Sequence, residues 1–306
     1  MFNKIVIVTR KTRMEQLIER FNTRSQAKFY IEHAGGDFQD YEREDAAYQH
    51  SLERVRNAAD VGVPMQFIDR SLVSTFLFQG HDLVVTLGQD GLVANTAKYA
   101  GVQPIIAINP EPERFDGILL PFVVDQAHGA IARLLDGKAT WREVTLAQAV
   151  LQDQQRLLAF NELFVGARSH VSALYRIHYG QRFEIQSSSG ILISTGAGST
   201  GWISSVFNMV SGIAEFCGGT HVSGIRMDWE DPRLLYLVRE PFQSRHSEIG
   251  MAAGMLACGQ ELVIESLMPE GGAIFSDGIE SDYLPFNSGA VVRIQAAERK
   301  ARLVVS

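Results

Sequence analysis

Two turns in this 306-residue chain place glycines and polar residues directly after an apolar, strand-like run. In the first turn, the segment 82–87 (DLVVTL) leads into Gly88-Gln89-Asp90-Gly91, and a helix-compatible segment follows. Glycines at a strand-to-helix turn let backbone amides and the helix N-terminus face a phosphate. A carboxylate there repels phosphate, so Asp90 makes sense if it accepts a proton from a hydroxyl, orients that hydroxyl or binds Mg²⁺. The alternative is a plain Gly/Asp turn.

The second turn is the hydroxyl-rich stretch 195–201 (TGAGSTG), which follows an apolar run. It meets three known patterns only in part. A dinucleotide-binding loop requires a second strand that ends in an acid about 20 residues on, and no such strand precedes Glu215. A nucleophile elbow at Ser199 requires glycine where Ala197 stands and a parallel sheet around it, and a Walker A loop requires a following lysine. What remains is a turn suited to the close approach of a ribose or phosphate.

Two shorter features also offer polar groups. Asn161-Glu162 precedes an apolar strand-like run, and its donor and acceptor atoms can fix a hydroxylated ligand or an amide. Asp277-Gly278 is typical of a hairpin turn. The eight histidines form no H-x-H or H-x₃-H pair, so we expect no protein-built zinc site.

The pattern of apolar residues predicts the elements that must position these turns. Residues 1–125 alternate apolar β-branched runs with longer polar segments, which indicates a βαβ arrangement with a mostly parallel sheet. The expected strands there are 5–8, 82–87 and 104–108, and the expected helices are 41–57 and 92–100.

Residues 126–306 begin with one short helix, 128–135, and then show period-2 alternation with Gly, Ser and Asn turns. The expected strands are 144–150, 162–165, 173–179, 182–186, 190–194, 234–238, 261–266, 273–275 and 291–296, with one helix at 202–213. The predicted fold class is therefore α/β + β: a Rossmann-like α/β domain (1–125) carrying the GxDG loop, then a β-rich, sandwich-like domain (126–306) carrying the other motifs.

Composition excludes several classes of protein. With 28 Lys and Arg against 35 Asp and Glu, the net charge is −7, which argues against a nucleic-acid partner bound through a basic field. Two cysteines, Cys217 and Cys258, cannot build a disulfide framework, so we expect a reducing compartment, the cytoplasm. The first apolar run is too short for a signal sequence or for the roughly 20 apolar residues of a membrane span, so we expect no membrane partner.

Taken in order, these motifs resemble those of the NAD kinase family. The family's G-G-D-G is matched by residues 88–91, its N-E pair by Asn161-Glu162, its T-P-T-G-S-T-A-Y by residues 195–202, and a late D-G by Asp277-Gly278. The likeness is closer to the mitochondrial-type branch. Four segments are similar to that branch: 109–114, 159–165, 188–199 and 238–241. The resemblance as a whole extends from Gly80 to Ile279.

The resemblance implies an enzyme in which two domains meet at a cleft. The 2′-hydroxyl of the adenosine ribose of NAD attacks the γ-phosphate of ATP, with Mg²⁺ neutralising the phosphates, and NADP forms. By the same resemblance Asp90 orients or deprotonates the hydroxyl, while Gly88 and Gly91 let the backbone approach the triphosphate. The resemblance also implies a homodimer or higher homo-oligomer.

The resemblance implies that the second domain binds the adenosine part of NAD. Asn161 and Glu162 would hold it, and the residues lining the same pocket would be Thr200, Gly201 and Ser205. Trp202 stands where the family has tyrosine, which should reshape this pocket.

The chain departs from the family pattern inside the first loop. Gln89 replaces a glycine and Leu92 a threonine, while Ser189 stands where many members have an acid. If position 89 requires a positive φ, glutamine costs about 1 kcal/mol or more there. Two alternatives therefore stay open: a related kinase that phosphorylates a sugar or lipid hydroxyl, and a non-catalytic nucleotide-binding homologue.

Overall fold

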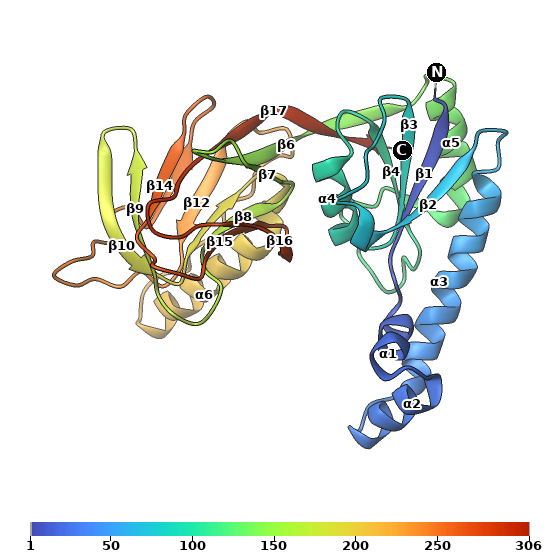
Figure 1. Cartoon of the computed structure of the whole chain (residues 1–306), viewed down its shortest axis with the longest axis horizontal. Helices are drawn as coiled ribbons and strands as arrows, with labels where there is room; N and C mark the ends of the chain where they lie inside the picture. The colour runs from blue at the N-terminus through green and yellow to red at the C-terminus, as the bar shows by residue number, and fades with distance from the viewer. Residues whose placement is uncertain (1, 306) are drawn as a thin grey trace. The chain divides into compact units, whose positions relative to one another are not determined.

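The structure, a computed structural model, describes residues 2–305 and divides into two compact units (Figure 1). The first unit comprises Met1–Arg142 with Arg302–Ser306, and the second comprises Glu143–Ala301. The first unit thus extends past the boundary at residue 125 that the sequence predicts. Helix α5 (Ala127–Leu135) belongs to it because Ile131 and Leu134 pack into its apolar core.

The first unit is built on a parallel sheet with the strand order β2-β1-β3-β4. Its strands are β1 (Lys4–Thr9), β2 (Met65–Asp69), β3 (Asp82–Leu87), β4 (Pro104–Asn109) and β5 (Phe122–Val123). Every residue of β3 and β4 is buried, as expected for parallel strands covered on both faces. The free edge of β4 is completed by β5 and by the end of β17 (Val291–Val305), through Arg302 and Leu303.

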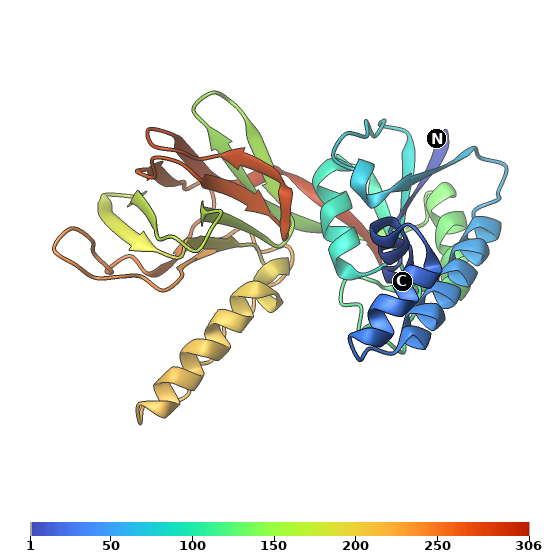
Figure 2. The same ribbon diagram turned by 60° about the horizontal axis from the view of Figure 1, so that its bottom comes forward.

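The remaining helices of the first unit are α1 (Arg13–Phe21), α2 (Arg24–His33), α3 (Phe38–Ala58) and α4 (Asp90–Tyr99). The predicted helix 41–57 lies inside α3. Thr12 begins α1 with a capping box to Glu15. Helices α1 and α2 lie at one end of this unit, beside the start of α3 (Figures 1 and 2). Their apolar side chains and those of the start of α3 form a small cluster of their own. In residues 2–305, no helix is long and apolar enough to cross a membrane.

The second unit contains two antiparallel sheets. One has the order β10-β9-β14-β17, with β6 paired to β17 and β7 paired to β6. The other has the order β13-β12-β11-β8-β15-β16. The strands of the first are β6 (Thr140–Leu151), β7 (Arg156–Ala159), β9 (Ala173–Tyr179), β10 (Arg182–Ser188), β14 (Leu262–Ser266) and β17. Those of the second are β8 (Glu162–Ala167), β11 (Ile191–Ser194), β12 (Leu234–Val238), β13 (Ala253–Leu256), β15 (Gly272–Ser276) and β16 (Ile279–Pro285).

The core of the second unit lies between its two sheets, because alternate side chains of each strand point inward. On β8, Leu163 and Val165 belong to this core, while Phe164 faces the opposite side. Helix α6 (Trp202–Phe216) covers that outer face and packs Ile203 and Val206 against it. The predicted fold class, an α/β part followed by a β-rich sandwich, is confirmed.

Candidate functional site

The first candidate half-site lies at the carboxyl edge of the parallel sheet. Strand β2 flanks β1 on one side and β3 flanks it on the other, so the order reverses between β1 and β3. Open α/β sheets bind ligands outside the carboxyl ends of their strands at such a reversal. Residues 88–91 follow β3 at this place, and Asp90 is the first residue of α4.

The loop is not strained by its departure from the family pattern. Gln89 has φ −95°, in the extended region, so the cost expected for a positive φ does not arise. Neither Gly88 nor Gly91 has a positive φ. A Cβ at Gly88 would lie 2.8 Å from a terminal methyl group of Leu92, so that side chain would have to shift. A Cβ at Gly91 would meet nothing within 4 Å.

The Asp90 carboxylate lines a pocket and binds the backbone next to the opposite side of that pocket. Its Oδ1 accepts a hydrogen bond from the backbone N–H of Leu119 at 2.8 Å. In residues 2–305 it makes no other hydrogen bond, which leaves Oδ2 available to a ligand. The pocket has a volume of about 430 Å³ and lies between Gln89-Asp90-Gly91 and the segment 114–118.

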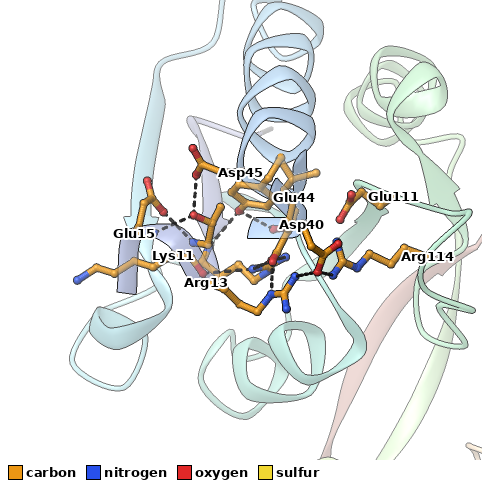
Figure 3. Close-up of polar contacts among 12 residues, drawn as sticks. Lys11, Arg13, Glu15, Asp40, Glu44, Asp45, Glu111 and Arg114 are labelled. Carbon is orange, nitrogen blue, oxygen red and sulfur yellow. Dashed lines mark hydrogen bonds and ion pairs between the residues drawn. The ribbon is translucent and has the colours of Figure 1, made fainter. Parts of the chain in front are cut away.

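Three arginines follow strands of this sheet: Arg10 and Arg13 come after β1, and Arg114 comes after β4. Figure 3 shows Arg13 and Arg114 close to Asp40. Arg10 binds Glu44 at 3.2 Å, and Arg13 binds Asp40 at 2.7 Å. Arg114 also reaches Asp40, at 3.3 Å, and lines the pocket that contains Asp90. The hydrogen bond from Arg13 holds the pKa of the Asp40 carboxyl below its usual value. Sequence reasoning missed this cluster, although two arginines directly after a first strand were a usable signal.

Mg²⁺ fits the chemistry of the first half-site. In residues 2–305 no group of three or more acidic, histidine or cysteine side chains can form a complete metal site. Mg²⁺ is usually held by one or two carboxylates together with substrate phosphates. Asp90 and Asp116 line one pocket and offer such carboxylates.

The second candidate half-site brings three of the sequence motifs together. Strand β8 lies between β11 and β15 and runs antiparallel to both. Glu162, at the start of β8, is therefore paired with Ser194 at the end of β11, and Leu163 with Ser276 at the end of β15. The Asn-Glu pair, the Gly-rich turn and the Asp-Gly turn consequently lie side by side at one end of this sheet.

Hydrogen bonds tie the three segments to one another. The Thr195 hydroxyl donates to the carbonyl of Phe160 at 2.6 Å, and its backbone N–H donates to the carbonyl of Asn161 at 2.9 Å. The Asp277 carboxylate accepts from the backbone N–H groups of Phe160, Asn161 and Glu162 at 3.0, 2.7 and 3.3 Å. These bonds fix the backbone from which Asn161 and Glu162 project.

The glycines of the second turn are required by close packing. A Cβ at Gly196 would lie 1.8 Å from the carbonyl oxygen of Asp228, and one at Gly198 would lie 2.1 Å from that of Asn161. Gly201 lies beside the Glu162 carboxyl, since a Cβ added at Gly201 would lie 3.6 Å from Oε2 of Glu162. The structure thus brings Gly201 to the Asn-Glu pair.

The other two residues expected in this pocket lie on the exposed surface. Thr200 ends the short turn before α6, and Ser205 lies in the first turns of that helix. In residues 2–305 no side-chain hydrogen bond joins either of them to the Asn-Glu pair.

Glu162 is a buried carboxyl group. Its side chain is paired with no cation in residues 2–305, and the residue is 8% exposed. Burial, and secondly the negative charge of Asp277, raise the pKa of Glu162 to about 8. At neutral pH Glu162 is therefore mostly a protonated acid, which can donate a hydrogen bond as well as accept one.

A pocket of about 390 Å³ in the second unit lies beside the first turn of α6. The Trp202 ring stacks on Phe164 with centroids 5.8 Å apart, and the Arg239 guanidinium lies over the Trp202 ring at 5.2 Å from its centroid. On the lining of the same pocket Arg168 lies over Tyr283 at 4.3 Å. Aromatic faces and arginines together suit a planar ring that carries phosphate. Sequence reasoning missed this pocket because its residues come from six separate segments.

Comparison with known proteins agrees with the fold. No protein-family model matches the chain. A curated NAD kinase of Chlorobium phaeobacteroides (strain BS1) is 29% identical over 126 residues, which are 40% of this chain and 43% of that protein. The match therefore spans less than half of the relative's length.

Two solved structures share the fold across nearly the whole chain. A yeast NADH kinase complexed with NADH has a TM-score of 0.60 at 16% identity, covering 100% of this chain and 84% of that one. An NAD kinase from Archaeoglobus fulgidus in complex with ATP has a TM-score of 0.57 at 14% identity, covering 98% and 92%. At these identities the likeness establishes the fold alone.

The packing of the Gly-rich turn predicts the effect of adding one methyl group. Gly198→Ala should lower the free energy of unfolding by about 2 kcal/mol or more, because its Cβ collides with backbone. Gly212→Ala, inside α6 with nothing within 4 Å, should raise it by up to about 1 kcal/mol. Urea unfolding measures both. Equal stability of the two variants would show that the turn is not packed as described.

Burial of Glu162 predicts a pH dependence of stability. Between its ordinary pKa of 4.5 and its folded value of about 8, the folded chain keeps a proton that the unfolded chain has lost. The resulting stabilisation is complete below pH 4.5 and declines by about 1.4 kcal/mol per pH unit as the pH rises through this window. The free energy of unfolding of wild type, minus that of Glu162→Gln at the same pH, should show this slope when plotted against pH. Parallel curves for the two proteins would contradict it.

Proposed function

We propose that this chain is an NAD kinase, which transfers the γ-phosphate of ATP to the 2′-hydroxyl of the adenosine ribose of NAD and gives NADP. The observation that carries the proposal is the convergence of three ordered motifs at one end of a sheet. Asp277 binds the backbone of Asn161 across 116 residues of sequence. The curated NAD kinase relative and the shared fold support the same activity.

Asp90 is the proposed proton acceptor. Its Oδ1 is engaged by Leu119, so Oδ2 takes the proton as the ribose oxygen bonds to the γ-phosphorus and the bond from that phosphorus to the ADP oxygen breaks. The amides at the start of α4, next to Gly88 and Gly91, and the Arg114 guanidinium face the phosphates. Mg²⁺, when bound with ATP, neutralises phosphate charge and polarises the γ-phosphoryl group.

The adenosine part of NAD is proposed to bind at the second half-site. Asn161 supplies an amide and Glu162 a protonated carboxyl, a pair with donors and acceptors for a ribose or a purine edge. Thr200, Gly201 and Ser205 border the same place at the start of α6. The aromatic pocket beside Trp202 is the proposed site for a planar ring and phosphate of the dinucleotide.

The alternatives differ from this proposal in the acceptor or in turnover. A sugar or lipid kinase would share the Asp90 pocket, so a screen of acceptors that follows ATP consumption separates it from an NAD kinase. A non-catalytic homologue would bind nucleotide without turnover. The extended conformation of Gln89 removes the backbone strain that would favour a disabled loop.

Two further proposals concern relationship and location. We propose that the chain is related to the mitochondrial-type branch of the family and that the protein is located in the cytoplasm.

We also propose that the chain forms a homo-oligomer. Exposed apolar side chains lie on one side of the C-terminal half of α6, which is the yellow helix of Figure 2. They belong to Met209, Val210, Ile213 and Phe216. Their spacing places them on one helix face, and Phe216 is 91% exposed. A contiguous apolar face of this kind marks an interaction surface, and a second copy of the chain is its proposed occupant.

Substitution of Asp90 tests the proposed reaction. Asp90→Asn should reduce kcat for NADP formation by about 100-fold or more, while keeping wild-type stability, because the amide oxygen still accepts from Leu119. Asp90→Ala should lose both activity and some stability. Wild-type turnover by Asp90→Asn would show that this carboxylate is not the proton acceptor. A wild type that forms no NADP and binds neither NAD nor ATP would refute the NAD kinase proposal.

Sedimentation velocity tests the oligomer. Ile213→Glu places a charge on the apolar face of α6 and should shift the protein to monomers. Leu77→Glu, at an apolar residue that is 81% exposed in the first unit, is the matched control and should leave the oligomer intact. A monomeric wild type, or an unchanged Ile213→Glu oligomer, would contradict the proposal.

A further inference from the structure

Asp277 occupies a two-residue hairpin turn whose backbone does not require a carboxylate. It joins β15 to β16, where Ser276 pairs with Ile279. Asp277 and Gly278 have φ of 53° and 69°, the conformation of a type I′ turn. Asn-Gly and Gly-Gly fit such a turn at least as well as Asp-Gly. The turn alone therefore leaves the charge of Asp277 unexplained.

The charged Asp277 side chain binds the backbone of a distant segment, residues 160–162, where β8 begins. The carboxylate accepts from three successive backbone N–H groups, those of Phe160, Asn161 and Glu162, at 3.0, 2.7 and 3.3 Å. In return, the N–H of Asp277 donates to the carbonyl of Glu162 at 3.0 Å. Hydrogen bonds to an ionised acceptor are stronger than neutral ones. Two of these amides, those of Phe160 and Asn161, precede β8.

The geometry points to Asp277 as a positioning residue for the nucleotide site: by binding three consecutive amides it fixes the direction in which Asn161 and Glu162 present their side chains. The identity of the bound nucleotide rests on the proposed function. The three hydrogen bonds from these amides to Asp277, which we call the clamp, are a property of the fold itself. The Thr195 bonds to the carbonyls of Phe160 and Asn161 hold the same segment from its other side.

A second effect of Asp277 follows from its charge. Burial and this neighbouring charge are the two causes that raise the pKa of Glu162. Asp277 therefore favours the protonated form of Glu162, in which the carboxyl offers a donor to the ligand. Asp277 thus fixes the direction of the Glu162 side chain and, together with burial, favours the proton that it carries.

Two substitutions separate this role from that of the hairpin. Asp277→Asn and Asp277→Gly both keep a favourable type I′ turn, but the first removes the charge and the second removes the whole side chain. Amide hydrogen exchange of the unliganded protein should become about tenfold faster at residues 160–162 in Asp277→Gly, because the amides lose a charged acceptor. Exchange in the rest of β8 should change less.

Steady-state kinetics give the readout that a purely structural role would not move. In both variants KM for NAD should rise, by about tenfold or more in Asp277→Gly, while KM for ATP stays within twofold of wild type. The pH profile of KM for NAD should also shift to lower pH in Asp277→Asn, since Glu162 then loses its proton more readily.

Asp153→Asn is the matched control. Asp153 accepts from the backbone N–H of Gln155 at 3.1 Å in the exposed turn between β6 and β7, so it also caps a turn of the second unit. Its replacement should leave both KM values and the exchange at 160–162 unchanged.

The outcomes decide the proposal even if the proposed function fails. Unchanged exchange at 160–162 in Asp277→Gly overturns the clamp, and faster exchange with an unchanged KM for NAD overturns the positioning role. If wild type forms no NADP, the function proposal has failed and calorimetric titration with NAD replaces kinetics. Weaker NAD binding by the variant then supports the positioning role, whereas equal affinity, or no binding by wild type, overturns it.

Discussion

The antiparallel register of β8 between β11 and β15 is the constraint on which the second half-site depends. It aligns the start of one strand with the ends of its two neighbours, so that Glu162 is opposite Ser194 and Leu163 opposite Ser276. The register is maintained because Leu163 and Val165 must face the core, and a slip of one residue would turn them outward. Burial of apolar side chains between the sheets therefore determines where the polar turns meet.

Polar groups at both half-sites are fixed mainly by backbone. Asp90 binds the amide of Leu119, and Asp277 binds the amides that precede β8. The chain has a net charge of −7, so the overall field does not attract anionic nucleotides, and local groups must do so. At the edge of the parallel sheet Arg13 and Arg114 share the carboxylate of Asp40, which holds both guanidinium groups in place before any ligand arrives.

Much of the fold could be predicted from the sequence because its strands are either fully buried runs or alternating ones. β3, β4 and β11 fall where apolar β-branched residues predict them. Strand β16 was missed because its sequence, IESDYLP, is largely polar and exposed, and β2 because it has a single buried residue. The end of β17 was missed because its pairing with β4 joins residues about 200 positions apart, which no local pattern encodes.

The candidate site was predictable as a set of motifs but not as a set of contacts. Glycine spacing identified both turns, yet the reason for Gly196 and Gly198 is the nearness of two carbonyl oxygens and not a positive φ. The Asp-Gly pair was predicted as a hairpin, which is confirmed, while the bonds of Asp277 to a distant segment depend on the sheet register.

The return of β17 to β4 has a consequence for synthesis of the chain. Arg302 and Leu303 pair with Pro104 and Ile105, and Val304 belongs to the core of the first unit. While the ribosome is still making the second unit, the parallel sheet of the first lacks this neighbour along one edge of β4. The first unit therefore completes its sheet only once Arg302 and Leu303 have left the ribosome, which is after the second unit has been synthesised.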